Sequence, residues 1–192
     1  LQRERFSRDL HDNIGSRTSL LMKNLETIRS NNTNDEVNLL QTNAKDIMQN
    51  LRETVWAMNS SFLSIESLAD KITLFAQERM PLDTKLVLEI NQEIANDETL
   101  DAEDFLNLYR ICQEAINNAI KYSEGTLLIL NFTFDKNKKL QIQIIDNGIG
   151  VDIKTVQENG FGIANMKARA AESNIEFEFN SNSGTHISLT KQ

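Results

Sequence analysis

Apolar residues in the first sixty positions recur every three or four residues, which is the spacing of an amphipathic helix. One apolar stripe occupies positions 6–28, and a second occupies positions 37–58 after a polar turn at positions 30–34. Each predicted helix has about 28 residues and a length of about 40 Å. Two stripes of this length cannot be buried within a single hairpin, so we expect a homodimer whose hairpins form a four-helix bundle.

The pattern changes after a predicted hinge at positions 59–61. Helical spacing predicts further helices at 65–77, 102–122 and 163–172, while apolar and polar residues alternate around 86–90, 128–134, 140–144 and 175–179. Alternation gives a strand one buried face and one wet face, which is typical of antiparallel or mixed sheets. We therefore predict an α+β chain with two domains. A helical hairpin spans 1–60, and an α/β sandwich with helices on one face of the sheet spans 61–192.

Composition and charge disfavour several classes of function. The net charge is −8, and an acidic surface of this kind repels nucleic-acid phosphates, so direct nucleic-acid binding is not expected. Cys112 is the single cysteine, so no intrachain disulfide can form, which favours a reducing compartment. The apolar runs are too short for a membrane span, and the first residue is not Met. We expect a soluble piece of a longer protein.

Asp146 breaks the apolar pattern at the end of a predicted strand. It shares the phase of Leu140, Ile142 and Ile144, so its carboxylate points toward the apolar layer. A buried carboxylate is costly unless a partner donates hydrogen bonds to it, so a donor is expected there. The run Asn147-Gly148-Ile149-Gly150 follows, and it allows a tight turn and close backbone approach. An ordinary Asn-Gly hairpin turn is the alternative interpretation.

Three polar residues share one stripe of the predicted helix at 102–122. Glu114, Asn118 and Lys121 can address a water, a hard cation and a phosphate, or they can form a solvated helix face. The run Gly160-Phe161-Gly162 precedes the last predicted helix, whose free N–H groups can hold an anion. Two glycines alone are a weak signal, and the dinucleotide-binding fingerprint is not met.

His11 lies off the apolar stripe of the first predicted helix, between Asp9 and Asp12. Acidic neighbours can orient an imidazole and keep one of its nitrogens protonated. Neither cysteine nor a second histidine lies at ligand spacing, so a metal site is not expected there. A plain exposed histidine is the alternative interpretation, and it is the preferred one for His186.

In their order along the chain, these segments resemble the transmitter region of sensor histidine kinases. The resemblance is to the subfamily whose partners are response regulators with LuxR-type helix-turn-helix output domains. Residues 8–15, Arg-Asp-Leu-His-Asp-Asn-Ile-Gly, resemble the phosphoacceptor box, and residues 113–121 resemble the N box of a Bergerat-fold ATPase. Residues 146–150 resemble the first glycine box. Residues 160–162 with Met166 resemble the second, and residues 184–185 the final Gly-Thr element.

The resemblance implies an ATP-dependent protein-histidine kinase with a Bergerat-type ATP-binding domain. It implies that His11 accepts the γ-phosphoryl group, that Asp12 orients His11 or takes its proton, and that Glu114 orders a water. The phosphoryl group would then pass to an aspartate in the receiver domain of a response regulator. The chain would be cytoplasmic, joined to a membrane-anchored sensor only through segments upstream of residue 1.

The resemblance also implies a nucleotide site that contains Mg²⁺. Asn118 would ligate Mg²⁺, Lys121 would contact phosphate, and Asp146 would accept a hydrogen bond from the adenine amino group. The pocket, its short lid and the adenine end would be shaped by Gly148, Gly150, Gly160, Gly162 and Thr185.

Two positions depart from the family pattern. Ser16 stands where the family usually has Gln, which predicts weak phosphatase activity toward the regulator, and Tyr122 stands where His often follows the N-box Lys. Two other functions remain open from the sequence. One is a Bergerat-fold Ser kinase of the anti-sigma-factor type, and the other is a catalytically silent nucleotide-binding adaptor. Acid-labile phosphate on the chain after incubation with ATP distinguishes histidine phosphorylation from both.

Overall fold

The computed structural model divides the chain into two compact units, Leu1–Ser60 and Ser61–Gln192. It describes residues 44, 51, 53, 54, 57, 63–81, 84–94, 98–151, 162–181 and 183–191. The five described residues of the first unit are all helical. The rest of the predicted hairpin, its turn and the dimeric bundle lie outside the described residues and stay predictions.

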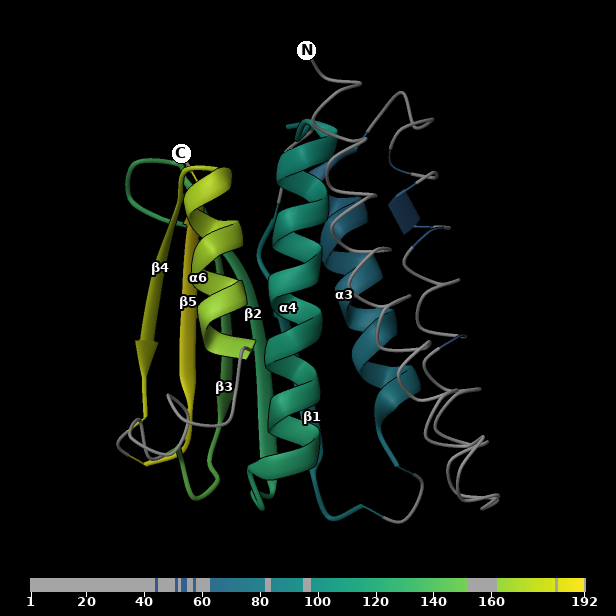
Figure 1. Cartoon of the computed structure of the whole chain (residues 1–192), viewed down its shortest axis with the longest axis vertical. Coiled ribbons are helices and arrows are strands. Elements are labelled where there is room, and N and C mark those ends of the chain that lie inside the picture. Colours follow the sequence, from purple (N-terminus) through teal and green to yellow (C-terminus); the bar gives the residue numbers. More distant parts are fainter. Residues whose placement is uncertain are drawn as a thin grey trace, which may run out of the picture. The chain divides into compact units, whose positions relative to one another are not determined.

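The second unit combines a mixed sheet with helices on one of its faces (Figure 1). Its elements in chain order are α3 (Ile65–Arg79), β1 (Val87–Gln92), α4 (Ala102–Tyr122), β2 (Leu127–Phe134), β3 (Leu140–Asp146), α6 (Gly162–Glu172), β4 (Ile175–Asn180) and β5 (His186–Lys191). The strand order is β1-β2-β3-β5-β4, in which β1 is parallel to β2 and the other pairs are antiparallel. The predicted α/β sandwich is confirmed.

The hydrophobic core lies between the sheet and the helices. Burial along β3 alternates strictly, with Leu140, Ile142 and Ile144 buried and the intervening residues partly exposed. From the helix side, α4 contributes a continuous buried stripe that includes Phe105, Leu108, Ile111, Cys112, Ala115, Ile116 and Ala119. The core therefore fixes the rotation of α4 against the sheet, and with it the direction of the polar side chains on that helix.

Capping side chains set where α3 and α4 begin. The Ser64 hydroxyl accepts a hydrogen bond from Ser67 N at 3.0 Å, and the Asp101 carboxylate accepts one from Asp104 N at 2.7 Å. Ser64 also forms a β-bridge with Thr99, so the start of α3 is tied to the segment that enters α4. In the described part of the second unit and at the five described positions of the first, no helix is long and apolar enough to cross a membrane.

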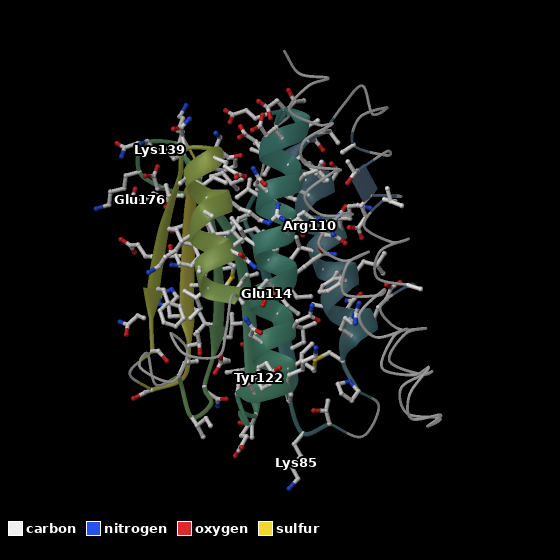
Figure 2. All side chains as sticks on the ribbon, in the orientation of Figure 1. Lys85, Arg110, Glu114, Tyr122, Lys139 and Glu176 are labelled. Carbon is white, nitrogen blue, oxygen red and sulfur yellow. The ribbon has the colours of Figure 1, made fainter. Side chains whose placement is uncertain are left out.

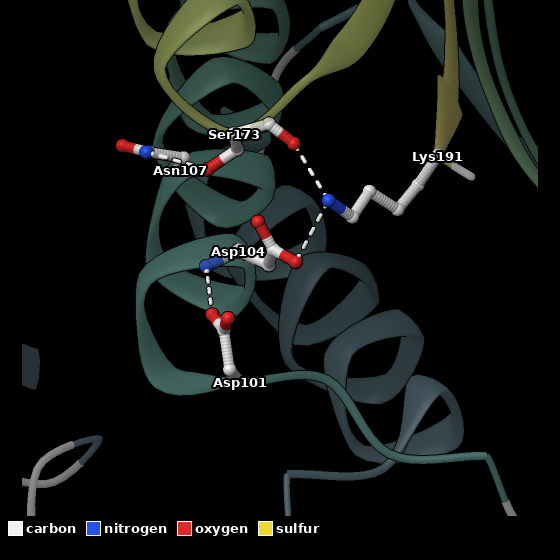
Figure 3. Close-up of polar contacts among 5 residues, drawn as sticks. All are labelled: Asp101, Asp104, Asn107, Ser173 and Lys191. Carbon is white, nitrogen blue, oxygen red and sulfur yellow. Dashed lines mark hydrogen bonds and ion pairs between the residues drawn. The ribbon is translucent and has the colours of Figure 1, made fainter.

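A group of paired polar side chains joins the N-terminal end of α4 to α6 and β5 (Figure 3). Lys191 Nζ lies 2.8 Å from Asp104 Oδ2 and donates to the Ser173 carbonyl at 2.6 Å. Asn107 Nδ2 donates to Ser173 Oγ at 2.8 Å, and Asn107 Oδ1 accepts from Arg169 at 3.3 Å. We call Asp104, Asn107, Arg169, Ser173 and Lys191 the polar clip.

Candidate functional site

Four of the sequence-predicted site residues, Asp146, Gly148, Gly150 and Thr185, lie at the end of α4 opposite the polar clip. The C-terminal ends of α4 and β3 meet there, because Ile149 N donates to the Ser123 carbonyl at 2.8 Å. The β4–β5 turn reaches the same place, since Asp146 N donates to the Thr185 carbonyl at 2.9 Å. We call residues 123–127, 146–151 and 183–185 the glycine-rich end.

Asp146 is buried, as its strand phase predicted, with 5% of its surface exposed. Its Oδ1 accepts a hydrogen bond from Gly148 N at 2.9 Å, so the chain itself supplies one of the expected donors. Among the described residues, no group donates to the second carboxylate oxygen. As far as the described residues go, Asp146 therefore retains an acceptor oxygen that a ligand can use.

Glycine is required at two positions here because the backbone packs against itself. A Cβ atom on Gly148 would lie 2.0 Å from the Ser123 carbonyl oxygen. A Cβ atom on Gly184, whose φ is +86°, would lie 2.0 Å from the Asp146 carbonyl oxygen. The close approach predicted at Gly148 is therefore to the chain's own α4–β2 loop, and it holds the backbone around Asp146 in place.

Asn147 makes contacts that the sequence did not predict. Its Oδ1 accepts hydrogen bonds from Thr126 N at 2.8 Å and Leu127 N at 2.9 Å, and its Nδ2 donates to Thr126 Oγ1 at 3.1 Å. The partners lie 20 and 21 positions away along the chain, so local turn chemistry gives no signal for them. The alternative interpretation of residues 147–150 as an ordinary hairpin turn is wrong, because β3 pairs with β2 and β5 and the next described element along the chain is the helix α6.

Glu114, Asn118 and Gly162 form a second cluster, on the face of α4 that meets the start of α6. Asn118 Nδ2 donates to Glu114 Oε1 at 3.3 Å. A Cβ atom on Gly162 would lie 2.5 Å from that same oxygen, so the first residue of α6 lies directly against the pair. Both side chains are partly buried, which disfavours the solvated-face alternative. Figure 2 locates this cluster, since it shows Glu114 on α4 between Arg110 and Tyr122.

The contact between Asn118 and Glu114 leaves the Asn118 carbonyl oxygen for another partner. Oxygen ligands of this kind suit Mg²⁺, which often takes one or two protein oxygens and completes its shell with water and phosphate. Within the described residues there is no group of three or more His, Cys, Asp or Glu side chains that could hold a metal ion. The donor set fits a metal that arrives with a phosphate ligand rather than an all-protein site.

Other predicted residues are less closely held. Lys121 is exposed near the end of α4, and Tyr122 beside it has 65% of its surface exposed. Gly150, with φ +71°, lies against Ser181. The remaining predicted residues, His11, Asp12, Ser16 and Gly160, lie outside the described residues.

Two buried groups take no part in this site. Burial raises the pKa of the Cys112 thiol far above its ordinary value, so the thiol remains protonated within the core. His186, at the start of β5, has an Nε2 atom that is buried without a hydrogen-bond partner. Its pairing position opposite Ile145 puts it on the sheet face away from Asp146. The expectation of a plain exposed histidine is wrong as far as exposure goes, since the residue is partly buried.

As a chemical arrangement, the second unit offers three features. A buried carboxylate has one oxygen to which no described residue donates, the Asn118 amide is held through its Nδ2 by the Glu114 carboxylate, and the N-terminus of α6 lies against that pair. A purine amino group, a hard cation and a phosphate match these features in turn. Asn118, in the second cluster, and Ser123, in the glycine-rich end, are about 7.5 Å apart along the axis of α4.

Two family models match the chain. The model described as histidine kinase-, DNA gyrase B-, and HSP90-like ATPase matches residues 103–192, and the model described as histidine kinase matches residues 2–63. Together they cover most of the chain, and the second match includes every position of the predicted phosphoacceptor box.

Two sensor proteins of staphylococci are similar to the chain along nearly all of its length. Sensor protein VraS of Staphylococcus epidermidis is 28% identical over 195 aligned positions, which cover 98% of this chain and 54% of that protein. VraS of Staphylococcus aureus is 28% identical with the same coverage. The chain thus spans about half the length of the curated relatives it matches.

Two solved structures share the fold. The histidine kinase AdeS of Acinetobacter baumannii gives a TM-score of 0.61 at 16% identity, covering 95% of this chain and 97% of that one. The histidine kinase domain of a blue-light activated histidine kinase from Erythrobacter litoralis gives 0.58 at 12% identity, covering 92% and 94%. At these identities the likeness establishes the fold alone.

Proposed function

Because the chain belongs to the histidine kinase family, we propose that it is the kinase core of a two-component sensor, which phosphorylates itself on His11 and passes the phosphoryl group to a response regulator. The observation that carries this proposal is the buried carboxylate of Asp146. No described residue donates to its second oxygen, and the backbone beside it is held in place by two glycines, within a domain of an ATPase family.

In this proposal Asp146 recognises the base of ATP. The free oxygen accepts a hydrogen bond from the exocyclic amino group of adenine, which satisfies a buried charge. Gly148 orients that carboxylate through its N–H, and Thr185 lies next to it on the β4–β5 turn. By the family resemblance, Gly150 would help to shape the pocket. The same role for Gly160, which lies outside the described residues, stays a prediction.

Asn118 and Glu114 serve the phosphate side. Mg²⁺, when bound with ATP, neutralises charge on the triphosphate and so supports phosphoryl transfer. Asn118 is the residue that would hold it through its amide oxygen, and Glu114 orients Asn118 and orders a water beside it. Lys121 and the N-terminus of α6 at Gly162 add positive potential for phosphate.

The transfer step uses His11 and Asp12. A neutral imidazole nitrogen of His11 attacks the γ-phosphorus, the bond to the β-γ bridging oxygen breaks, and ADP leaves with that electron pair. Asp12 would orient the His11 ring, or take the proton of the other ring nitrogen as the imidazole gains positive character. Catalysis then consists of positioning and charge neutralisation.

The proposal extends to partners and location. The apolar stripes of residues 1–60 support a homodimer, and the phosphoacceptor match supports transfer to a receiver-domain aspartate, with LuxR-type regulators as the partner class. The chain then works in the cytoplasm, joined to a sensor through upstream segments. The two alternatives, the Ser kinase and the catalytically silent adaptor, are not favoured, because residues 2–63 match the histidine kinase model.

Incubation of the chain with γ-labelled ATP and Mg²⁺ tests the proposal. We expect label that is lost in acid and retained in alkali, and that is absent in His11→Ala. The matched control is His186→Ala, which changes the only other histidine of the chain and should keep full labelling. Full labelling of His11→Ala contradicts the assignment, and acid-stable label favours the Ser kinase.

A further inference from the structure

Asn147 is exposed, yet its side chain makes three hydrogen bonds to a distant loop. Two backbone N–H groups, from Thr126 and Leu127, converge on its Oδ1 within 2.9 Å. Hydrogen bonds of an exposed side chain add little to the free energy of unfolding, because water competes for each of them. What the contacts do provide is a fixed position for the peptide that follows Asn147.

That peptide carries the group that orients Asp146. Gly148 N donates to Asp146 Oδ1 at 2.9 Å, and Gly148 itself has no room for a side chain against Ser123. A continuous set of contacts therefore runs from the Thr126 and Leu127 N–H groups through Asn147 to the Gly148 N–H and the Asp146 carboxylate. The contacts to Asn147 fix the direction of the Gly148 N–H, and that N–H in turn fixes the rotation of the Asp146 carboxylate.

We propose that Asn147 is a positioning residue for base recognition and sets the preference for adenine over guanine nucleotides. It holds the Asp146 carboxylate in the rotation that aims the free oxygen at an exocyclic amino group. Guanine presents a carbonyl oxygen at the position of that amino group, and two acceptors that face each other repel. The inference rests on the proposed function, since it takes Asp146 as the residue that contacts the base.

Loss of the Asn147 side chain should leave the fold in place. The two loops remain joined by backbone hydrogen bonds from Ile149 N to Ser123 O at 2.8 Å and from Asn147 N to Leu127 O at 3.3 Å. Because the side chain is exposed, water can replace the three lost contacts. What is lost is the fixed direction of the Gly148 N–H, and with it the selectivity of Asp146.

Calorimetric titration of the full chain with ADP and with GDP, each in the presence of Mg²⁺, tests this role. We expect the parent to prefer ADP, and Asn147→Ala to bind ADP about tenfold more weakly while GDP affinity stays unchanged. The matched control is Asn137→Ala, an exposed asparagine with a side-chain contact to Asp135 in the turn at the other end of β3. It should leave the ADP to GDP ratio at the parent value.

Two conservative variants refine the test. Asn147→Asp keeps an oxygen for the Thr126 and Leu127 N–H groups, and Thr126→Val removes only the Oγ1 contact. Each should lower the ADP to GDP ratio by only about twofold. If Asn147→Ala fails to fold in a thermal melt, Thr126→Val decides, and an unchanged ratio there overturns the inference.

The outcomes separate this inference from the proposed function. An unchanged ADP to GDP ratio in folded Asn147→Ala overturns the positioning role. Parallel losses for both nucleotides indicate a structural role only, and also overturn it. If the parent itself binds neither nucleotide or does not prefer ADP, the proposed function fails, and this inference fails with it.

Discussion

The two ends of α4 differ in how their polar side chains are paired. At the polar clip, each of the charged and amide groups meets a partner within the chain, through contacts of 2.6 to 3.3 Å. At the glycine-rich end, Asp146 is more deeply buried than the Asp104–Lys191 ion pair, yet the described residues supply a donor to only one of its carboxylate oxygens. The same helix and the same sheet support both arrangements (Figure 1).

The difference separates a structural role from a binding role. A buried polar network with all its partners stabilises the fold and offers nothing to a ligand. A carboxylate oxygen to which no described residue donates, beside backbone that glycines hold in place, can accept a hydrogen bond from a ligand. We therefore expect changes at the polar clip to alter stability, and changes at the glycine-rich end to alter binding.

Gly184→Ala should have the largest effect, because it perturbs both properties at once. The new Cβ atom would meet the Asp146 carbonyl oxygen at 2.0 Å, at a φ of +86° that side chains rarely adopt. We expect about 3 kcal/mol less free energy of unfolding, together with loss of ADP binding. Chemical denaturation and calorimetry measure the two effects. The neighbouring Ser183→Ala, at an exposed position, should resemble the parent, and parent-like behaviour of Gly184→Ala contradicts the packing argument.

Asn107→Ala should separate stability from binding. The change leaves Ser173 Oγ and the Arg169 guanidinium without their Asn107 contacts at a position that is 3% exposed. The free energy of unfolding should fall by about 1–3 kcal/mol in chemical denaturation. Asn165→Ala, on the exposed side of α6, serves as the control and should change stability little. A weaker ADP affinity in Asn107→Ala, in protein that is still folded, breaks the distinction between the two ends.

Alkylation of Cys112 measures how often the hydrophobic core opens, and this core supports both the polar clip and the glycine-rich end. The Cys112 thiol is fully buried and burial raises its pKa, so alkylation requires the core to open. In the native parent we expect slow labelling that becomes complete in denaturant, as mass spectrometry measures. In Asn107→Ala, a stability loss of about 1.4 kcal/mol should speed labelling about tenfold if opening is global. Rapid labelling of the native parent contradicts the buried environment.

Asp135 should give the smallest effect, in the β2–β3 turn next to the polar clip. Hydrogen bonds from the backbone of Lys139, and then of Asn137, lower the pKa of its carboxyl group. A lowered pKa in the folded state means that the stabilisation is present above the ordinary pKa of aspartate and is lost as pH falls through the folded-state value. Asp135→Ala should therefore lower Tm slightly at pH 7 and leave it unchanged near pH 2. An equal change at both values contradicts the assignment.

Much of the second unit was predictable from the sequence. The helix at 102–122 has the predicted bounds, because a 21-residue apolar stripe with an Asp cap leaves little ambiguity. The burial of Asp146 followed from strand phase alone. Contacts between residues far apart in the chain were not predictable. Asn107 meets Ser173 across 66 positions, and Asn147 meets Thr126 across 21, and neither pairing leaves a periodic signal.

The structural roles of the glycines were the hardest feature to predict from the sequence. The sequence indicated close approach near Gly148, but it could not show that the neighbour is the Ser123 carbonyl rather than a ligand. The predictions for His11, Asp12 and the dimeric bundle rest on the sequence pattern and on the match of residues 2–63 to the histidine kinase model, since these residues lie outside the described ones.

The central claim is that the glycine-rich end binds the nucleotide while the polar clip only stabilises the fold. Calorimetric titration of Asp146→Asn and Asn107→Ala with ADP and Mg²⁺, paired with thermal melts, tests it most directly. Asn can still accept from Gly148 N, but it loses the charged acceptor, so Asp146→Asn should bind ADP about 10- to 150-fold more weakly. Its Tm should match the parent's, whereas Asn107→Ala should bind ADP normally and melt earlier. Parent-like ADP affinity in Asp146→Asn contradicts the account.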